Sequence, residues 1–309
     1  MSKSIANIQL NNDFIAAPLA GYTDIAFRKL CIENGAAMAV TEMVSVKGLC
    51  YRNPQTERLL LISEAEAPSC LQLFGSDYKD FLQADGAGYF DKFDILDINM
   101  GCPVNKVVKN GEGSALLKTP SVAADIVKSL SDRGRTVTVK MRSGFYENQN
   151  VAVEFALKMQ EAGAAMVAVH ARTRAQLYGG KADYLITKSV KQALTIPVAV
   201  SGDIVDMQSF KERADCADFY MIGRGALARP DIFNVLQGKP PKTKVELILR
   251  HIELLNEYFD ERYAVNQLRK FMAYYLKGER GVKELKAKVY YLCTVSEIKS
   301  EIEKVFCGK

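Results

Sequence analysis

The chain has 309 residues, 48% of them hydrophobic, and its formal net charge of +5 permits an anionic partner without requiring one. Its seven cysteines are scattered without a CxxC pair and it has only two histidines, which argues against a metal site, so we predict that no metal is bound. No long apolar run and no signal peptide occur, so we expect a reduced, cytoplasmic and monomeric protein that is not attached to a membrane.

Eight short runs with the composition of buried strands recur along the first 223 residues. Most are continuously apolar, as expected for strands that are covered on both faces. Helical patterns separate them: one has Thr23 as a candidate N-cap and Gly35 beyond its end, and another has Pro120 at its first position. Eight alternating strand–helix units favour an α/β fold, a (β/α)8 TIM barrel, over a doubly wound sheet. The runs lie at residues 14–18, 37–43, 69–74, 95–100, 136–141, 166–171, 197–202 and 218–223.

The pattern changes near residue 238. The stretch GKPP at 238–241 is typical of a linker, and from about residue 243 the apolar spacing is purely helical. This helical segment is too long to serve only in closing a barrel, so it predicts a small C-terminal helical bundle. We therefore expect two domains, a catalytic barrel at 1–238 and a helical domain at 239–309.

Polar residues, or for the first strand the turn at 18–20, follow most of the predicted strands, at the end of the barrel where active sites of this fold form. Each one taken singly has a structural alternative, since a strand-end amide can serve as a cap and a lone histidine is more often a core residue. Their recurrence at one end of the barrel indicates a site. The residues are Pro18, Leu19, Ala20, Gln72, Asn99, Cys102, Lys140, Arg142, His170, Arg172 and Arg174.

The last two loops, SGDI at 201–204 and IGRGAL at 222–227, are the clearest of these signals. Glycine lets backbone N–H groups approach phosphate oxygens, and such barrels commonly hold a phosphate in these loops. The glycines of either loop could instead serve only a tight turn, but the pair favours a phosphate. A flat ring beside it would need backbone donors, an amide and a cation, which residues 18–20, Gln72 and Lys140 can supply. The phosphate candidates are Ser201, Gly202, Asp203, Gly223 and Arg224.

Cys102 begins a long glycine- and lysine-bearing segment in DILDINMGCPVNKVVKNGEGSALLK, residues 94–118. It has no neighbouring metal ligands, so its thiol could be a nucleophile or a proton donor. A thiol with a pKa of about 8.5 is mostly protonated near neutrality, which suits a general acid. We expect a flexible loop that lets this cysteine close over a bulky substrate. The alternative, a buried structural cysteine, fits poorly with its position before Pro103 at a strand end.

Together these segments resemble the tRNA-dihydrouridine synthases, with a likeness to the bacterial B-type branch. The resemblance covers nearly the whole chain, and DINMGCPVNKVVKNGEGSALL is its most specific motif. The segments APLAGYTDIAFR, LQLFGSD, VKMRSG, VHARTRAQLYGG, SGDI and MIGRGAL occur in the family's order, and LRKFMAYYLKG resembles its helical RNA-recognition domain. Departures are mild: Leu19 stands where Met is usual, Ser201 where Asn is common, and Phe271 and Tyr274 where His and Trp are frequent in that branch.

The resemblance implies an enzyme that binds FMN, is reduced by NADPH and reduces the C5–C6 bond of selected uridines in tRNA. It makes Cys102 the proton donor, residues 1–238 the FMN-binding domain and residues 239–309 the RNA-recognition domain. FMN would be held by Pro18, Leu19, Ala20, Gln72, Asn99, Lys140, His170, Ser201, Gly202, Asp203, Gly223 and Arg224. Substrate contacts would come from Asn99, Arg142, Arg172, Arg174, Arg269, Lys270 and Lys277.

The tail between Arg269 and Lys288 is basic, with tyrosines interleaved, which suits RNA phosphates and unstacked bases, although a solvated helix face is the alternative. Three other functions stay open. They are a dihydrouridine synthase acting on ribosomal RNA, an FMN barrel dehydrogenase of a small molecule resembling dihydroorotate dehydrogenase, and a non-catalytic RNA-binding protein. The small-molecule enzyme would not need the basic tail, and the non-catalytic protein would not need Cys102 and Lys140. The sequence specifies neither the uridine that is reduced nor a preference for NADPH over NADH.

Overall fold

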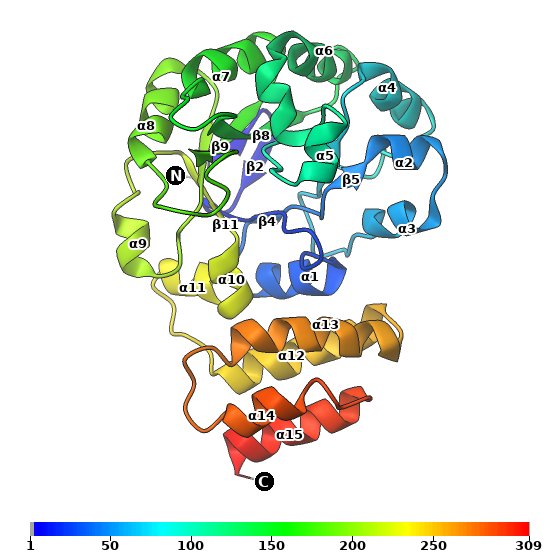
Figure 1. Cartoon of the computed structure of the whole chain (residues 1–309), viewed down its shortest axis with the longest axis vertical. Coiled ribbons are helices and arrows are strands. Elements are labelled where there is room, and N and C mark those ends of the chain that lie inside the picture. Colours follow the sequence, from blue (N-terminus) through cyan, green and yellow to red (C-terminus); the bar gives the residue numbers. More distant parts are fainter. Residues whose placement is uncertain (1–2, 309) are drawn as a thin grey trace.

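The chain forms a parallel β-barrel surrounded by helices, with a helical domain below it (Figure 1); this computed structural model describes residues 3–308. The barrel sheet has the order β4-β3-β11-β10-β9-β8-β7-β6-β5, and all its pairings are parallel. All eight predicted strand regions contribute to it, which confirms the (β/α)8 barrel. The strands are β3 (Phe14–Ala16), β4 (Met38–Ala39), β5 (Val44–Ser45), β6 (Cys70–Phe74), β7 (Ile95–Met100), β8 (Val137–Gly144), β9 (Met166–Thr173), β10 (Val198–Ser201) and β11 (Phe219–Ile222).

The second strand position, predicted as one strand at 37–43, is interrupted. Its first part, β4, pairs with β3, and its second part, β5, pairs with β6. Between them Val40 bridges to Cys70, which closes the ring. The hydroxyl of Thr41 accepts a hydrogen bond from the backbone N–H of Gln72, so a side chain replaces a rung of the backbone ladder where the strand breaks.

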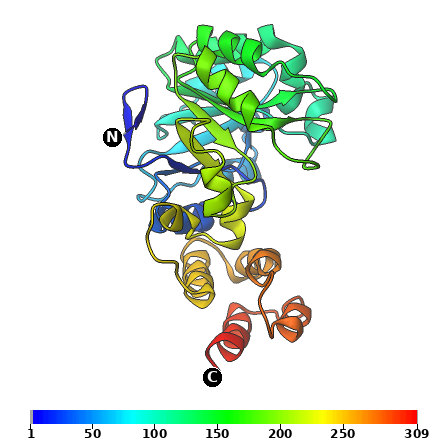
Figure 2. The ribbon, with the colours of Figure 1, turned by 90° about the vertical axis from the view of Figure 1, so that its left-hand side faces the viewer.

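An N-terminal hairpin, which the sequence analysis did not predict, closes the end of the barrel opposite the strand C-termini. It consists of β1 (Lys3–Ile5) and β2 (Ile8–Leu10) and lies beside the barrel in Figure 2. Ile5 and Leu10 are buried in the same apolar cluster as Met38 and Met166 from the barrel interior. Burying these side chains excludes water from that end of the barrel.

Helices follow the strands around the outside of the barrel. The predicted Thr23 N-cap is wrong: the carboxylate of Asp24 caps α1 by accepting from the N–H of Phe27, and Thr23 bonds to the backbone of Leu19 instead. Gly35 follows this helix with a φ of +98°, as predicted. The helices of this part are α1 (Ile25–Glu33), α2 (Val46–Cys50), α3 (Pro54–Glu57), η1 (Arg58–Leu60), α4 (Tyr78–Gly86), α5 (Asn105–Lys109), η2 (Gly113–Lys118), α6 (Pro120–Ser131), α7 (Ala152–Glu161), α8 (Tyr184–Ala193), α9 (Met207–Lys211), α10 (Arg224–Ala228) and α11 (Ile232–Leu236).

The helical domain shares a hydrophobic core with the barrel. It comprises α12 (Lys244–Tyr258), α13 (Glu261–Tyr275), α14 (Lys283–Lys288) and α15 (Val295–Cys307), after an irregular segment at 239–243. Figure 1 shows α12 and α13 directly below α1 and α10. Phe27 and Leu30 of α1 belong to one buried cluster with Leu255 of α12 and Phe271 of α13. This continuous core fixes the helical domain against the barrel.

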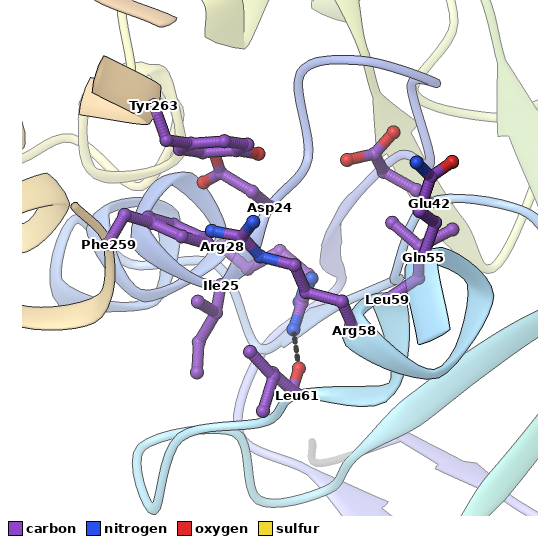
Figure 3. A pocket seen from close by; sticks show the side chains of 10 residues that line it. All are labelled: Asp24, Ile25, Arg28, Glu42, Gln55, Arg58, Leu59, Leu61, Phe259 and Tyr263. Atoms are coloured by element: carbon purple, nitrogen blue, oxygen red, sulfur yellow. Dashed lines mark hydrogen bonds between the residues drawn. The ribbon is translucent and has the colours of Figure 1, made fainter. Parts of the chain in front are cut away.

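A small cavity of about 270 Å³ lies where the two parts meet, and Figure 3 shows its side chains. The guanidinium carbon of Arg58 lies 5.0 Å from the ring centre of Phe259 and 4.7 Å from that of Tyr263, which are themselves stacked. The hydroxyl of Tyr263 lies 3.3 Å from Oδ2 of Asp24 and donates to it. Burial raises the pKa of Asp24 from 3.8 to about 6, so its ionised form is costly in the folded state.

Replacing Asp24 with Asn should therefore stabilise the protein near pH 7 and lose about half of that advantage near pH 5. Between pH 3.8 and about 6 the folded state holds a proton that the unfolded state has lost, so wild-type stability rises as the pH falls through 6. Asn keeps an acceptor for the N–H of Phe27. The gain near pH 7 should be at most about 3 kcal/mol, measured by urea unfolding at both pH values.

Asp260→Asn is the matched control, because Asp260 caps α13 in the same way but is exposed. The difference in the free energy of unfolding between wild type and Asp24→Asn should shrink as the pH is lowered. If it does not, the ionisation of Asp24 does not limit stability.

Candidate active site at the barrel mouth

A cavity of about 660 Å³ lies at the C-terminal ends of the barrel strands. Its size is within the usual range for cofactor sites. It is bounded by the loops after β3, β10 and β11, by residues of β8 and β9, and by α13 of the helical domain. Nine residues predicted from separate loops line this one cavity: Pro18, Leu19, Lys140, His170, Ser201, Gly202, Asp203, Gly223 and Arg224.

The two glycine turns lie side by side because β10 and β11 are adjacent, with Ser201 in register with Met221. Gly202 has a φ of +112°, and a Cβ added there would lie 3.0 Å from Cδ2 of His170. A Cβ at Gly225 would lie 2.4 Å from the carbonyl oxygen of Ile204. Both positions therefore require glycine, because the backbone of one turn passes so close to its neighbours.

The lining is rich in positive charge. Lys140, Arg224, Arg229 and Lys277 line the cavity together with one acid, Asp203. Asp203 is already paired, since its carboxylate accepts from Arg172 at 2.6 Å and from Arg224 at 2.9 Å. Partial burial opposes its ionisation, but these two guanidinium groups lower the pKa of Asp203 overall. The cavity thus offers an excess of cations to an anionic ligand.

Lys140 is half-buried at this cavity, and within residues 3–308 no hydrogen bond or ion pair holds its ammonium group. Burial lowers its pKa to about 8, and the charge of Asp97 opposes that shift. The lysine is therefore a cationic donor without a protein acceptor. His170 stays neutral, because burial, followed by the charge of Lys140, lowers its pKa to about 2.

Gln72 and Asn99 do not line this cavity, and they lie on the adjacent strands β6 and β7. Asn99 is in register with Lys140, so both side chains stand at the same level of the barrel. Gln72 is buried and bonded to Asn99. Ala20 is exposed beyond the cavity-lining residues Pro18 and Leu19.

Cys102 lies just beyond the end of β7 and is only 9% exposed. Burial raises the pKa of its thiol, against the opposing charges of Arg142 and Lys140, so the group is protonated at neutral pH. The flexible loop predicted here is instead largely folded into α5 and η2. The carbonyl of Cys102 accepts from the N–H of Ser114, which fastens the start of this segment to its end.

The predicted substrate-binding residues Arg142 and Arg172 do not lie on an exposed surface, since each is 2% exposed. Arg142 donates to the carbonyls of Gly101, Thr173 and Leu177 at 3.0, 2.7 and 2.7 Å. Arg172 donates to the carbonyls of the 179–180 turn and to Asp203. Their guanidinium groups tie the loops of the mouth together, because buried carbonyls at loop ends require donors.

Arg174 is less buried and donates to Oδ1 of Asn105 at 2.5 Å, joining its loop to the Cys102 segment. In the helical domain, Lys270 is exposed beside the first barrel loop, with its Nζ 3.5 Å from the carbonyl oxygen of Gly21. Lys277 lines the main cavity itself. Arg269 is turned away, because it donates to the carbonyl of Leu292 and lines a separate cavity beside Cys293.

Eight cavity-lining residues were not among the predicted site residues, and three of them, Tyr178, Arg229 and Tyr274, carry polar groups on their side chains. Tyr178 lies near the guanidinium groups of Arg142 and Arg224, at 5.5 and 5.0 Å from its ring centre. Its position in the motif VHARTRAQLYGG was a signal that could have singled it out. Arg229 follows the last residue of α10, and Tyr274 reaches the cavity from α13. No feature of the sequence pattern indicated that Tyr274, in the helical domain, lies against the barrel.

Across residues 3–308, no group of three or more His, Cys, Asp or Glu side chains is arranged to hold a metal ion. None of the helices in that part is both long and apolar enough to cross a bilayer.

The family model described as dihydrouridine synthase (Dus) matches residues 15–306. The tRNA-dihydrouridine synthase B of Vibrio vulnificus is 35% identical over 297 residues, which cover 91% of this chain and 92% of that protein. The probable tRNA-dihydrouridine synthase of Rickettsia bellii is 32% identical and covers 98% of this chain and 97% of its own length. Among solved structures, morphinone reductase has a TM-score of 0.58 at 13% identity, covering 79% of this chain and 90% of its own, which shows the shared fold.

Proposed function

The chain belongs to the dihydrouridine synthase family, and from this premise we propose that it reduces the C5–C6 double bond of particular uridines in tRNA. We propose FMN as its cofactor and NADPH as its reductant, with Cys102 as proton donor. The observation that carries this proposal is the cation-rich cavity at the barrel mouth, where Lys140 has no partner among residues 3–308 and a protonated Cys102 lies just beyond the end of the adjacent strand β7. Such a substrate would place the enzyme in the cytoplasm.

The residues present fit FMN. Four cationic side chains line the cavity with one acid, Asp203. Arg224 is paired with that acid and Arg229 with Asp231, so Lys140 and Lys277 supply the charge that a phosphate requires. The turns that contain Gly202 and Gly223 line the cavity, and their backbone N–H groups would bind phosphate oxygens, with Arg224 beside them. Among residues 3–308 the Lys140 ammonium group has no protein acceptor, and a cation at a ring edge stabilises an anionic reduced flavin. Pro18 and Leu19 line the side of the cavity formed by the first loop.

When bound, FMN would supply the hydride that adds to C6 of the uracil ring. Cys102 then supplies the proton that C5 requires, so the double bond gains one hydride and one proton and the thiol is left as thiolate. Burial keeps the thiol protonated until that moment. Arg142 holds the carbonyl of Gly101, and so fixes the backbone next to the thiol. The uridine must leave its stack to reach this depth, as in other base-modifying enzymes.

The helical domain supplies the proposed surface for the rest of the tRNA. Lys270 stands exposed beside the first barrel loop, where a phosphate could be neutralised without disturbing the cavity. Family membership favours this function over a small-molecule dehydrogenase and over a non-catalytic RNA-binding protein.

The purified protein should be yellow and release FMN, rather than FAD, on denaturation. Lys140→Met should weaken FMN binding by about 10- to 100-fold, because a charge-assisted contact is lost while the side chain keeps its length. Titration of the apoprotein, followed by quenching of flavin fluorescence, measures this change. Lys188→Met, at an exposed position on α8, is the control. Equal FMN affinities of Lys140→Met and Lys188→Met would show that Lys140 does not contact the cofactor.

Cys102→Ala should retain FMN and oxidise NADPH at a near wild-type rate, since that half-reaction needs no proton from the thiol. Its reduction of uridine in unmodified tRNA should be slower by about 10²–10⁴-fold, the usual contribution of a general acid. Anaerobic stopped-flow absorbance separates the two half-reactions, with Cys293→Ala as an exposed cysteine control. Unchanged flavin reoxidation by tRNA in Cys102→Ala would make this cysteine structural.

Lys270→Ala should weaken tRNA binding and lower the slope of log affinity against log salt by about 1, as expected for one lost phosphate contact. Binding measured across a salt series tests this. Lys304→Ala, an exposed lysine on α15 paired with Glu301, should leave the slope unchanged. If Lys270→Ala keeps the wild-type slope of log tRNA affinity against log salt, the Lys270 side chain does not contact a phosphate.

A further inference from the structure

We propose that Asp97, a buried residue outside the cavity, is a positioning residue that holds Cys102 in place through the side chains of Gln72 and Asn99. The inference deepens the proposed function, in which Cys102 is the proton donor. It rests on an unbroken series of hydrogen bonds that runs from the interior of the barrel to the backbone of Cys102.

The series begins with a carboxylate whose two oxygens both accept hydrogen bonds. Asp97 lies on β7 between Gln72 of β6 and Thr138 of β8, in register with both, and is 1% exposed. Its Oδ2 accepts from Nε2 of Gln72 at 2.7 Å, and its Oδ1 accepts from the hydroxyl of Thr138 at 2.7 Å. An ionised carboxylate only accepts, so it fixes which end of the Gln72 amide faces it.

That choice determines the next two groups. With its nitrogen held by Asp97, Gln72 presents Oε1 to Nδ2 of Asn99, which donates at 2.9 Å. The amide oxygen of Asn99 must then face the other way, where it accepts from the N–H of Gly101 at 3.1 Å and of Cys102 at 2.9 Å. Reversing either amide would set two donors or two acceptors against each other. The backbone position of Cys102 therefore depends on Asp97.

A carboxylate is an expensive residue at this position. Its neighbours Ile95, Leu96 and Ile98 on β7 are fully apolar and buried, and a buried charge costs free energy even when it is well bonded. Burial raises the pKa of Asp97, against the hydrogen bonds from Gln72 and Thr138 and the charge of Lys140. If position 97 served stability alone, an apolar residue would suffice there. Orienting the Gln72 amide, in contrast, requires a hydrogen-bond acceptor at this position.

The test exchanges the polarity of the series. Asn99→Asp places the Gln72 side chain between two carboxylates. The amide nitrogen of Gln72 can face only one of them, so the other faces the amide oxygen and is repelled. The backbone of Cys102 should then lose its fixed position. Adding Asp97→Asn restores every bond. The new amide at position 97 donates to Oε1 of Gln72, whose nitrogen donates to the new carboxylate at position 99, which still accepts from the N–H of Cys102. Asp97→Asn alone should be tolerated, because the Thr138 hydroxyl can turn from donor to acceptor.

The readout is the rate at which iodoacetamide alkylates Cys102 in the purified holoprotein, relative to the exposed Cys293 of the same molecule, measured by peptide mass spectrometry. Asn99→Asp should raise this ratio by about 10-fold, and the double variant should return it to within about 3-fold of wild type. This rate does not require tRNA turnover, so it can fail independently of the proposed function.

A third substitution distinguishes coupling through the Gln72 amide from the simple loss of repulsion between two carboxylates at positions 97 and 99. Gln72→Met has a similar size but cannot transmit amide polarity, so in its presence Asp97→Asn should no longer rescue Asn99→Asp. If Asn99→Asp does not fold, recovery of soluble, folded protein by Asp97→Asn, seen with Gln72 but not with Met at position 72, reports the same coupling. Absence of rescue, or equal rescue in both backgrounds, would overturn the proposal.

Discussion

The site depends on one constraint, the parallel pairing of all barrel strands, which makes every strand end at the same rim. Register then sets which side chains share a level. Asn99 is opposite Lys140, Arg142 opposite His170, and His170 opposite Ser201. Residues far apart along the chain are thus brought to one mouth by backbone hydrogen bonds alone. The N-terminal hairpin closes the other end of the barrel, so the mouth is the end left for a ligand.

A second layer of interactions, between buried polar side chains, gives the mouth its shape. Arg142 joins the loop after β7 to the loop after β9, and Asp203 holds Arg172 and Arg224 at the same carboxylate. These groups satisfy one another within the protein, but Lys140 is left without an acceptor among the described residues. In this cavity the acidic side chain is already paired and a lysine is not, which favours the binding of an anion. This pairing distinguishes the cavity from a surface that is only basic.

The barrel could be predicted because its strands are continuous apolar runs, a signal that survives without tertiary information. The N-terminal hairpin could not, since its strands have three residues each and lie among polar residues. The glycine turns and Lys140 were found from their places at strand ends. The burial of Arg142 was not, because it depends on carbonyls of residues 101, 173 and 177, which only the folded loops bring together. Asp97 was overlooked as one polar residue inside an apolar strand.

The formation of dihydrouridine in tRNA can be measured in cells. Dihydrouridine should be mapped by mass spectrometry in tRNA and ribosomal RNA from cells with and without the gene. Deletion should remove dihydrouridine from one or more tRNA positions, and the wild-type gene should restore it whereas the Cys102→Ala gene should not. Unchanged dihydrouridine in tRNA after deletion, or its loss from ribosomal RNA alone, would show that this chain does not modify tRNA.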